Sequence, residues 1–352
     1  MTMRAVLRLG GGAVDRLDTQ LRRHLRQVTL QPFALYSAAV VRIGLAGLFL
    51  LFLLRELPHA DRLWGPGSPF TPALLQETVQ ANGWDGFLGW WFTFLATDEP
   101  LVFWTLYVTA IVVSALYLLG WHTRALAFVF CFFVVAFYMR GFLANSGWAM
   151  LSMLFANYLV FCASGRRWSL DARRRARRER EASGGRMSPA GISETEELRR
   201  RLVTVLHNAG MAVIAFQVMV VYGSAAMYKI QGETWREGTA LYYALLSDDF
   251  STWPELSSWF AGHGTLMAVL AYVTVFSQVL FPALVFNRRL KYCVVVVMMG
   301  THLGIGVLMA LPMFSAVSIV GDLVLLPDTF WLRAAALVRL LRAPPPTAAR
   351  VE

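Results

Sequence analysis

The chain has 352 residues, of which 57% are hydrophobic and only 15% are charged, and its formal net charge is +10. Soluble domains are roughly half apolar and a quarter charged. Because apolar runs of span length also recur along this whole chain, the composition excludes a soluble protein. The positive charge comes from arginines between the apolar runs, which is typical of a cytoplasmic membrane face. We therefore expect the lipid bilayer as a partner, and no nucleic acid.

These runs predict an all-α fold, a polytopic helical membrane protein with about eight transmembrane helices and short interfacial helices in the outer loops. Residues 1–33 form a basic amphipathic segment that we place on the cytoplasmic surface, and they contain no recognisable signal-peptide cleavage site. Helices one to four occupy residues 34–164, in which the acidic loop 55–100 is rich in tryptophan and proline and predicts the interfacial helices. The four predicted spans cover residues 34–54, 101–119, 125–139 and 149–164.

An arginine-rich loop separates the two halves of the chain. Residues 165–201 contain twelve arginines among 37 residues, which marks this loop as cytoplasmic. Helices five to eight then occupy residues 202–328, and residues 329–352 form a cytoplasmic amphipathic helix and tail. This arrangement predicts a multi-pass protein of a bacterial-type cell membrane with both termini in the cytoplasm. The spans of the second half cover residues 202–228, 266–286, 292–311 and 314–326.

Lys229 stands at the outer end of the fifth predicted span, and it is the only lysine before residue 290. An ionisable residue at membrane depth is costly enough to indicate a functional site. A lysine near a span end, however, also commonly extends its ammonium group to the lipid headgroups. The residues leave both interpretations open. In a functional site, a desolvated Lys229 acts as a base, and a hydrated one holds an anionic headgroup, a carboxylate or a quinone oxygen.

Further ionisable residues lie in or at the ends of the predicted spans. Arg42 and Asp322 are candidates for a structural ion pair across the bundle, and a functional role for them is the open alternative. Arg140 ends the third span and shares the leaflet of Lys229. His302 lies among glycines that permit close helix packing, so a hydrogen-bonded core histidine is the simpler interpretation. No metal site is predicted, because the three cysteines are isolated in apolar runs.

The chain around Lys229 combines small residues at a span end, a lysine, an aliphatic residue, a tryptophan and a glycine. These residues are Ala225, Ala226, Lys229, Ile230, Trp235 and Gly238. Supporting features are Arg42, the GWHTR turn at 120–124, Arg140 with Asn145, and His302. On these residues the chain from about 34 to 328 resembles the transmembrane half of vitamin K-dependent γ-carboxylases and the related HTTM (horizontally transferred transmembrane) domain family.

The resemblance implies a redox site. Lys229 and His302 would be catalytic, with Lys229 as the base that deprotonates a reduced, vitamin K-like quinone. The residues that would bind the substrate or the quinone are Trp235, Gly238, Arg140 and Asn145. We do not expect a full carboxylase, because the chain ends soon after the last span and leaves no room for the large extramembrane domain. A stand-alone HTTM protein is the better match, similar to the membrane component that helps to mature a secreted peptide toxin in sporulating bacteria.

Three functions remain open from the sequence. The first is an enzyme-like protein whose outward pocket around Lys229 binds a quinone or lipid and performs base chemistry, with an exported peptide as its substrate. The second is a non-enzymatic maturation or export partner of a secreted peptide, which the outer loops 55–100 and 230–263 would hold. The third is a small-solute transporter, although the two halves show no clear internal repeat.

Overall fold

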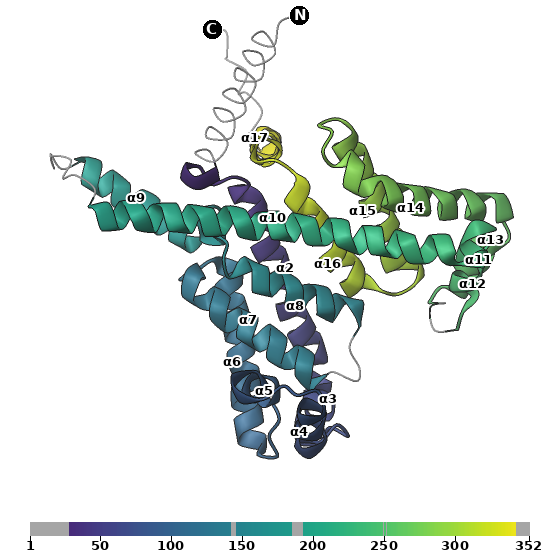
Figure 1. Ribbon diagram of the computed structural model, residues 1–352, viewed down its shortest axis with the longest axis horizontal. Helices are drawn as coiled ribbons and strands as arrows, with labels where there is room; N and C mark the ends of the chain where they lie inside the picture. The colour runs from purple at the N-terminus through teal and green to yellow at the C-terminus, as the bar shows by residue number, and fades with distance from the viewer. Residues whose placement is uncertain (1–27, 142–145, 185–192, 249, 251, 343–352) are drawn as a thin grey trace, which may run out of the picture.

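The computed structural model describes residues 28–141, 146–184, 193–248, 250 and 252–342 (Figure 1). Every regular element in these ranges is a helix, which confirms the all-α class. Six of the described helices are long and apolar enough to cross a membrane, or up to seven if one bent pair counts as a span, so the chain is a multi-pass membrane protein. The six contain α2 (Leu35–Glu56), α6 (Pro100–Leu119), α7 (Thr123–Arg140), α10 (Glu194–Gln231), α14 (Gly264–Leu284) and α15 (Leu290–Leu308).

The predicted count of eight spans is not confirmed. Predicted span 149–164 overlaps α8 (Gly147–Leu159), which has 13 residues. Predicted span 314–326 overlaps α16 (Pro312–Asp322), which has 11 residues. The chain bends by 108° between this segment and the amphipathic tail helix α17 (Asp328–Arg342). A straight span needs about 20 residues. Both short helices pack against α2 and against each other instead, and they help to form the centre of the bundle.

Short helices fill the two long acidic loops, as expected for loop 55–100. That loop contains α3 (Ala60–Trp64), α4 (Pro72–Ala81) and α5 (Gly86–Thr93). The second loop contains α11 (Glu233–Arg236), α12 (Ala240–Leu246) and α13 (Pro254–Ala261). In Figure 1, α3 to α5 lie at one end of the molecule, beneath α7, and α11 to α13 lie at the far end of α10.

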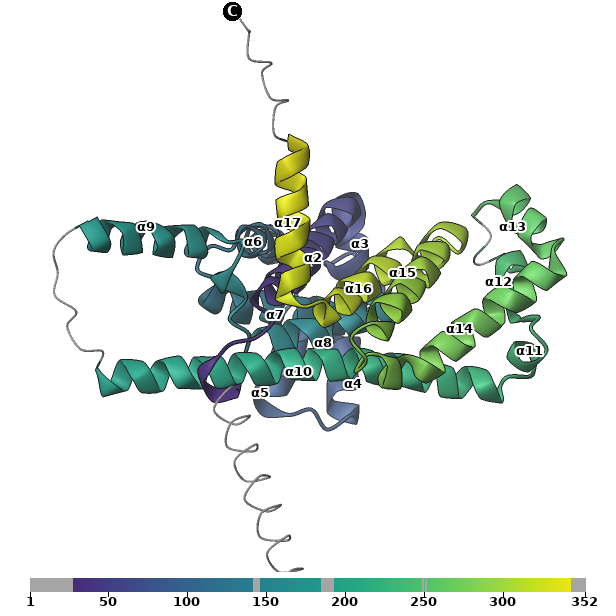
Figure 2. The ribbon, with the colours of Figure 1, turned by 90° about the horizontal axis from the view of Figure 1, so that it is seen from above.

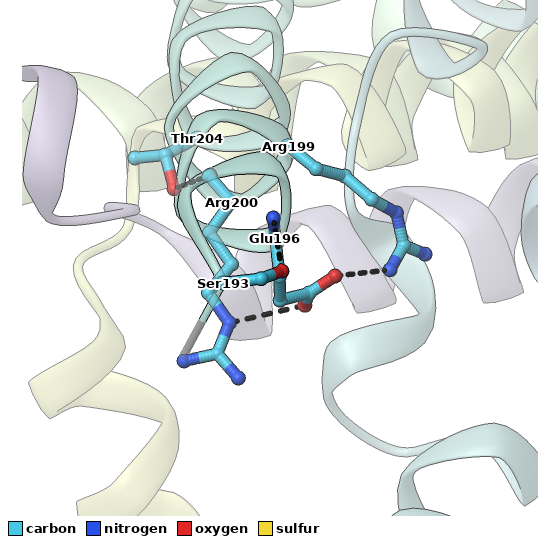
Figure 3. Close-up of polar contacts among 5 residues, drawn as sticks. All are labelled: Ser193, Glu196, Arg199, Arg200 and Thr204. Carbon is cyan, nitrogen blue, oxygen red and sulfur yellow. Dashed lines mark hydrogen bonds and ion pairs between the residues drawn. The ribbon is translucent and has the colours of Figure 1, made fainter. Parts of the chain in front are cut away.

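The arginine-rich loop is more ordered than its composition indicates. It forms α9 (Leu170–Gly184), and α10 begins at Glu194, ahead of the apolar segment (Figure 2). Ser193 caps α10 by accepting the N–H of Glu196, whose carboxylate then pairs with Arg199 and Arg200 at 3.0 and 3.1 Å (Figure 3). Such cap and i,i+3 or i,i+4 pairs favour a helix even where the sequence is strongly charged. The glycine-rich middle of the loop lies largely outside the described residues.

Arg42 joins three segments at the centre of the protein, where its side chain is fully buried. Its Nη1 donates to the carbonyls of Tyr117 and Leu118 at 2.6 and 2.9 Å, and its Nη2 donates to Trp168 O at 2.7 Å. The expected ion pair with Asp322 is therefore wrong, since Asp322 accepts a hydrogen bond from Tyr222 instead. The last carbonyls of a helix have no partner within it, and a guanidinium with its forked donors satisfies those of α6.

Asp171, at the start of α9, caps α7 from outside that helix. Its carboxylate accepts the N–H groups of His122 and Thr123 at 3.0 and 2.7 Å, and the Thr123 hydroxyl at 2.8 Å. Burial alone raises the pKa of Asp171, but these hydrogen bonds outweigh burial and hold the pKa below its ordinary value. The ionised carboxylate thus holds the α6–α7 turn and the start of α9 together.

Asp171→Asn is expected to lower the free energy of unfolding by about 1 kcal/mol near neutral pH, because the cap loses its charge. A carboxyl whose folded pKa is depressed stabilises the protein above its unfolded pKa, and this contribution is lost as the pH falls through the folded pKa. The free energies of unfolding of the wild type and the variant should therefore become equal at acidic pH. Denaturant unfolding in mild detergent across this pH range measures the difference. Glu181→Gln is the control, since Glu181 forms only an exposed pair with Arg177 on the same helix; an equal loss in both variants contradicts the capping role.

Candidate functional site

Lys229 lies in the last turn of α10 and is half-buried. Its Nζ donates to Gln278 Oε1 of α14 at 3.0 Å, and it lies 5.2 Å from the centroid of the Trp235 ring. An ammonium over an indole face is an attractive arrangement. The lysine is thus held from two sides within the protein, which favours the site interpretation over a lysine that extends freely to the headgroups.

Lys229 and His302 line one cavity of about 120 Å³. Lys229 reaches it from α10 and His302 from α15, while α8, α14 and α16 complete its walls. The walls are mainly apolar, and the polar side chains among them come from a few residues. The lining residues are Leu151, Phe155, Val218, Val221, Tyr222, Ala225, Lys229, Gln278, His302, Ile305, Phe314 and Ser318. A small apolar cavity with a few convergent polar groups is the usual form of a ligand site.

Tyr222, His302 and Asp322 form a buried hydrogen-bonded triad beside this cavity. The Tyr222 hydroxyl donates to Asp322 Oδ1 at 2.8 Å, and His302 Nε2 lies 3.0 Å from the same hydroxyl oxygen. A hydroxyl has one proton, so His302 must donate through Nε2 when Tyr222 donates to Asp322. In a neutral imidazole this leaves Nδ1 as an acceptor. His302 Nδ1 and Asp322 Oδ2 are both buried without a hydrogen-bond partner among the described residues.

Two of the residues that line this cavity therefore have hydrogen-bonding capacity that the described residues do not use. Lys229 Nζ supplies donors beyond the one that it shares with Gln278, and His302 supplies the unpartnered Nδ1. A buried polar atom without a partner costs free energy, so a ligand hydroxyl that donates to Nδ1 would be favoured. The arrangement suits a ring that carries oxygen atoms, with the apolar walls in contact with its faces.

Of the other residues that the resemblance suggested, only some lie near the Lys229–His302 cavity. Trp235 covers Lys229, as described. Gly238 has a φ of 74°, and a Cβ there would come within 2.9 Å of Ala268 Cβ, so this glycine permits the turn between α11 and α12 to approach α14. It does not line the cavity. Asn145 lies outside the described residues.

Arg140 belongs to a different part of the molecule. Its side chain is fully buried, and its Nη1 donates to Phe70 O while its Nη2 donates to Gly65 O at 3.2 Å. Arg140 therefore binds the end of α7 to the chain between α3 and α4. The structure does not bring it to the Lys229 cavity.

Three residues of the site were missed or misassigned from the sequence: Tyr222, Gln278 and Asp322. Tyr222, Ala225, Ala226 and Lys229 follow the i, i+3, i+4, i+7 spacing of one helix face, which is the signal that places Tyr222 on the face of Lys229. Gln278 is a polar residue inside an apolar span, and such a residue commonly hydrogen-bonds across helices. Nothing local to Asp322 indicates its true partner.

Tyr222→Phe is expected to lower the free energy of unfolding by about 2 kcal/mol, because the buried Asp322 carboxyl loses its only described hydrogen bond. Unfolding in mixed detergent micelles measures the change. Tyr228→Phe is the matched control on the same helix, since Tyr228 is 80% exposed. If the two variants unfold alike, the triad does not stabilise the bundle.

Within the described residues, no group of three or more histidine, cysteine, aspartate or glutamate side chains is arranged to hold a metal ion. No protein-family model matches the chain, and neither any curated protein nor any solved structure is similar to it at a significant level. The resemblance drawn from the residues around Lys229 therefore stays a prediction.

Proposed function

We propose that this membrane protein binds the ring of a reduced quinone, or of a similar hydroxylated ring compound, in the Lys229–His302 cavity and removes a proton from it. One observation carries the proposal: side chains from α10 and α15, far apart in the sequence, meet in the same apolar cavity. The chemistry is that of a general base, which must lie within hydrogen-bond reach of the proton that it accepts.

The size of the cavity limits the ligand. An apolar cavity of about 150 Å³ in another protein holds one benzene molecule, and this cavity has about 120 Å³. Because it is somewhat smaller, it encloses no more than one ring, so a second fused ring, the ring substituents and any isoprenoid tail would extend among the helices or into lipid. A bulky polar substrate, such as a folded peptide, does not fit in it.

The two polar side chains would have distinct roles. His302 Nδ1 accepts a hydrogen bond from a ring hydroxyl, and the Tyr222–Asp322 pair fixes the histidine ring by holding its other nitrogen. Lys229 binds a second ring oxygen, and, when it is uncharged, it is the stronger base of the two. A ring oxygen that becomes an anion is stabilised by the ammonium nearby.

The proposal also includes the location of the protein and its orientation in the membrane. The protein would lie in a bacterial-type cell membrane with both termini in the cytoplasm and the Lys229 end of α10 facing out. The exported peptide, or a partner protein, would then meet the outer loops that contain α3 to α5 and α11 to α13. The family placement as a stand-alone HTTM protein belongs to this proposal as well.

Mass spectrometry of lipid-soluble molecules that co-purify with the chain in mild detergent tests the proposal. A quinone or naphthoquinone close to one equivalent per chain is the expected result. A preparation that contains no such molecule, and that binds none when naphthoquinols are added, contradicts it. A secreted peptide that co-purifies without any ring compound would instead favour the non-enzymatic partner, and counterflow of a solute in vesicles would favour a transporter.

A further inference from the structure

A second and larger cavity, of about 840 Å³, lies at the other end of α10 from Lys229. The first turns of α7 and α10, the start of α9 and the chain before α2 surround it. Its volume is within the range of about 300–1,000 Å³ that ligand pockets have. The lining residues on which the inference depends are Arg124, Arg166, Asp171, Arg175, Glu196, Arg199 and Arg200.

Hydrogen bonds hold the walls of this cavity in place. Asp171 ties α9 to the start of α7, as described above. Asn208 of α10 donates to the carbonyls of Val28 and Gln31 at 2.6 and 2.9 Å and accepts the N–H of Phe33 at 3.0 Å. The chain that precedes α2 therefore forms a fixed wall, and it contributes Leu30 and Pro32 to the lining.

Positive charge exceeds negative charge around the cavity. Five arginines line it, against the carboxylates of Asp171, Glu179 and Glu196. Asp171 is occupied by the α7 cap, Glu196 is shared between Arg199 and Arg200 (Figure 3), and Glu179 is also engaged. The five guanidinium groups outnumber the three carboxylates, all of which already have partners, so the lining keeps a net positive charge.

The guanidinium groups of Arg124 and Arg166 form no hydrogen bond or ion pair with another residue in the described ranges. Two neighbouring arginines, in contrast, contact aromatic rings. Arg167 lies over the Tyr36 ring at 5.3 Å, and Arg174 lies over the Trp121 ring at 6.0 Å. Burial, and then repulsion by Arg175, Arg124, Arg167 and Arg200, holds the pKa of Arg166 below its ordinary value. The positive charges thus repel one another across a cavity that an anion can enter.

Part of the cavity wall is apolar. This apolar wall consists of Leu30, Pro32, Ala125, Ala163 and Val203. Arg124 is the second residue of the apolar helix α7, and Val203 begins the apolar part of α10, so the cavity lies where two spans start. A ligand that places an anion on the arginines and an apolar part on this wall is an amphiphile at the membrane surface. Basic pockets between spans on the cytoplasmic side bind anionic headgroups in this way.

We propose that this cavity, here called the arginine cavity, binds a phosphate group, and that the phosphate belongs to the headgroup of an anionic membrane phospholipid. Arginine guanidinium groups bind phosphate oxygens through two parallel hydrogen bonds. The apolar wall contacts the glycerol and the first acyl carbons. The cavity is separate from the Lys229–His302 site and does not depend on its function.

The test compares binding of phosphatidylglycerol and phosphatidylcholine to the purified full chain, by native mass spectrometry in mild detergent. Arg124→Gln with Arg175→Gln removes two exposed lining charges, and it should weaken phosphatidylglycerol binding by about tenfold or more. The matched control, Arg173→Gln with Arg178→Gln, removes two exposed charges of α9 that do not line the cavity, and it should change binding by less than about twofold. Arg166→Gln provides a third variant with a single change, in case the double variant does not fold.

Two results would overturn the inference, and a third would overturn only the assignment of the phosphate to a lipid. Equal weakening by the two double variants would show a general attraction of the basic segment to anionic lipid. Equal binding of the two lipids would show that the cavity does not select a net anionic headgroup. Displacement of the lipid by inorganic phosphate or glycerol phosphate at similar concentration would leave the phosphate site standing, but it would assign the site to a soluble phosphate compound.

Discussion

Arg42→Met is expected to lower the free energy of unfolding by about 3–5 kcal/mol, because three carbonyls, one buried and two part-buried, lose their shared donor at the centre of the bundle. Arg42 holds the last turn of α6 and the chain at Trp168 from the middle of α2. Gly120, just beyond α6, would place a Cβ within 2.7 Å of Arg42 Nη1, which shows how closely the chain wraps the guanidinium. The loss is measured by unfolding in mixed micelles and by the yield of folded protein.

Arg55→Met is the control for Arg42, since Arg55 lies on the same helix but is half-exposed, and its partners are Glu56 and the Phe52 ring on the same helix. Arg55→Met should lower the free energy of unfolding by no more than about 1 kcal/mol. Arg42→Lys should recover only part of the stability, because one ammonium cannot reproduce the forked donors that reach two segments at once. A full recovery by lysine would show that the charge matters and the hydrogen-bond geometry does not.

Lys229→Met is the second substitution with a large expected effect, in this case on naphthoquinol binding and on turnover. Loss of a charged hydrogen-bond donor should weaken naphthoquinol binding by about tenfold to a hundredfold. If Lys229 also takes the proton, turnover should fall by about 10²–10⁴-fold. Binding is measured by retention of the ring compound on the purified protein, and turnover by oxidation of added naphthoquinol in air-saturated buffer, where dissolved oxygen takes the electrons of the deprotonated ring.

The same substitution at the only other lysine, Lys291→Met, is the matched control, because Lys291 lies at the start of α15 and does not line the cavity. It should leave binding unchanged. Lys229→Met should shift the unfolding midpoint little, because its one hydrogen bond to Gln278 is only part-buried. A large loss of stability, with ligand binding retained, would show that Lys229 is structural.

Much of the fold could be predicted because its causes are local. Apolar runs of span length predicted the helices that begin near residues 35, 101, 125, 202, 266 and 292, and the structure has helices there. The two short runs were overcounted as spans. Pro312 and the bend of 108° after α16 shorten the last one, and hydropathy measures the apolar character of a segment without measuring its straight length.

The candidate site was predicted in part. Lys229 was recognised because a single lysine at the end of an apolar run is rare, and His302 entered through the resemblance. Their shared cavity could not be predicted, since it depends on how α10, α14, α15 and α16 pack. Asp322 was paired with Arg42 because opposite charges at membrane depth need partners, but two buried charges can each be satisfied by neutral groups.

The sequence by itself determined the class of this protein, its helical segments and its arginine-rich loops, because each of these features follows from the composition of one continuous stretch of chain. The tertiary structure alone decided the partners of Arg42, which lie 75 to 126 residues away and are backbone carbonyls. Every residue has such a carbonyl, so no residue type marks it. The triad of Tyr222, His302 and Asp322 and the arginine cavity depend equally on helix packing, which brings side chains together without regard to their distance along the chain.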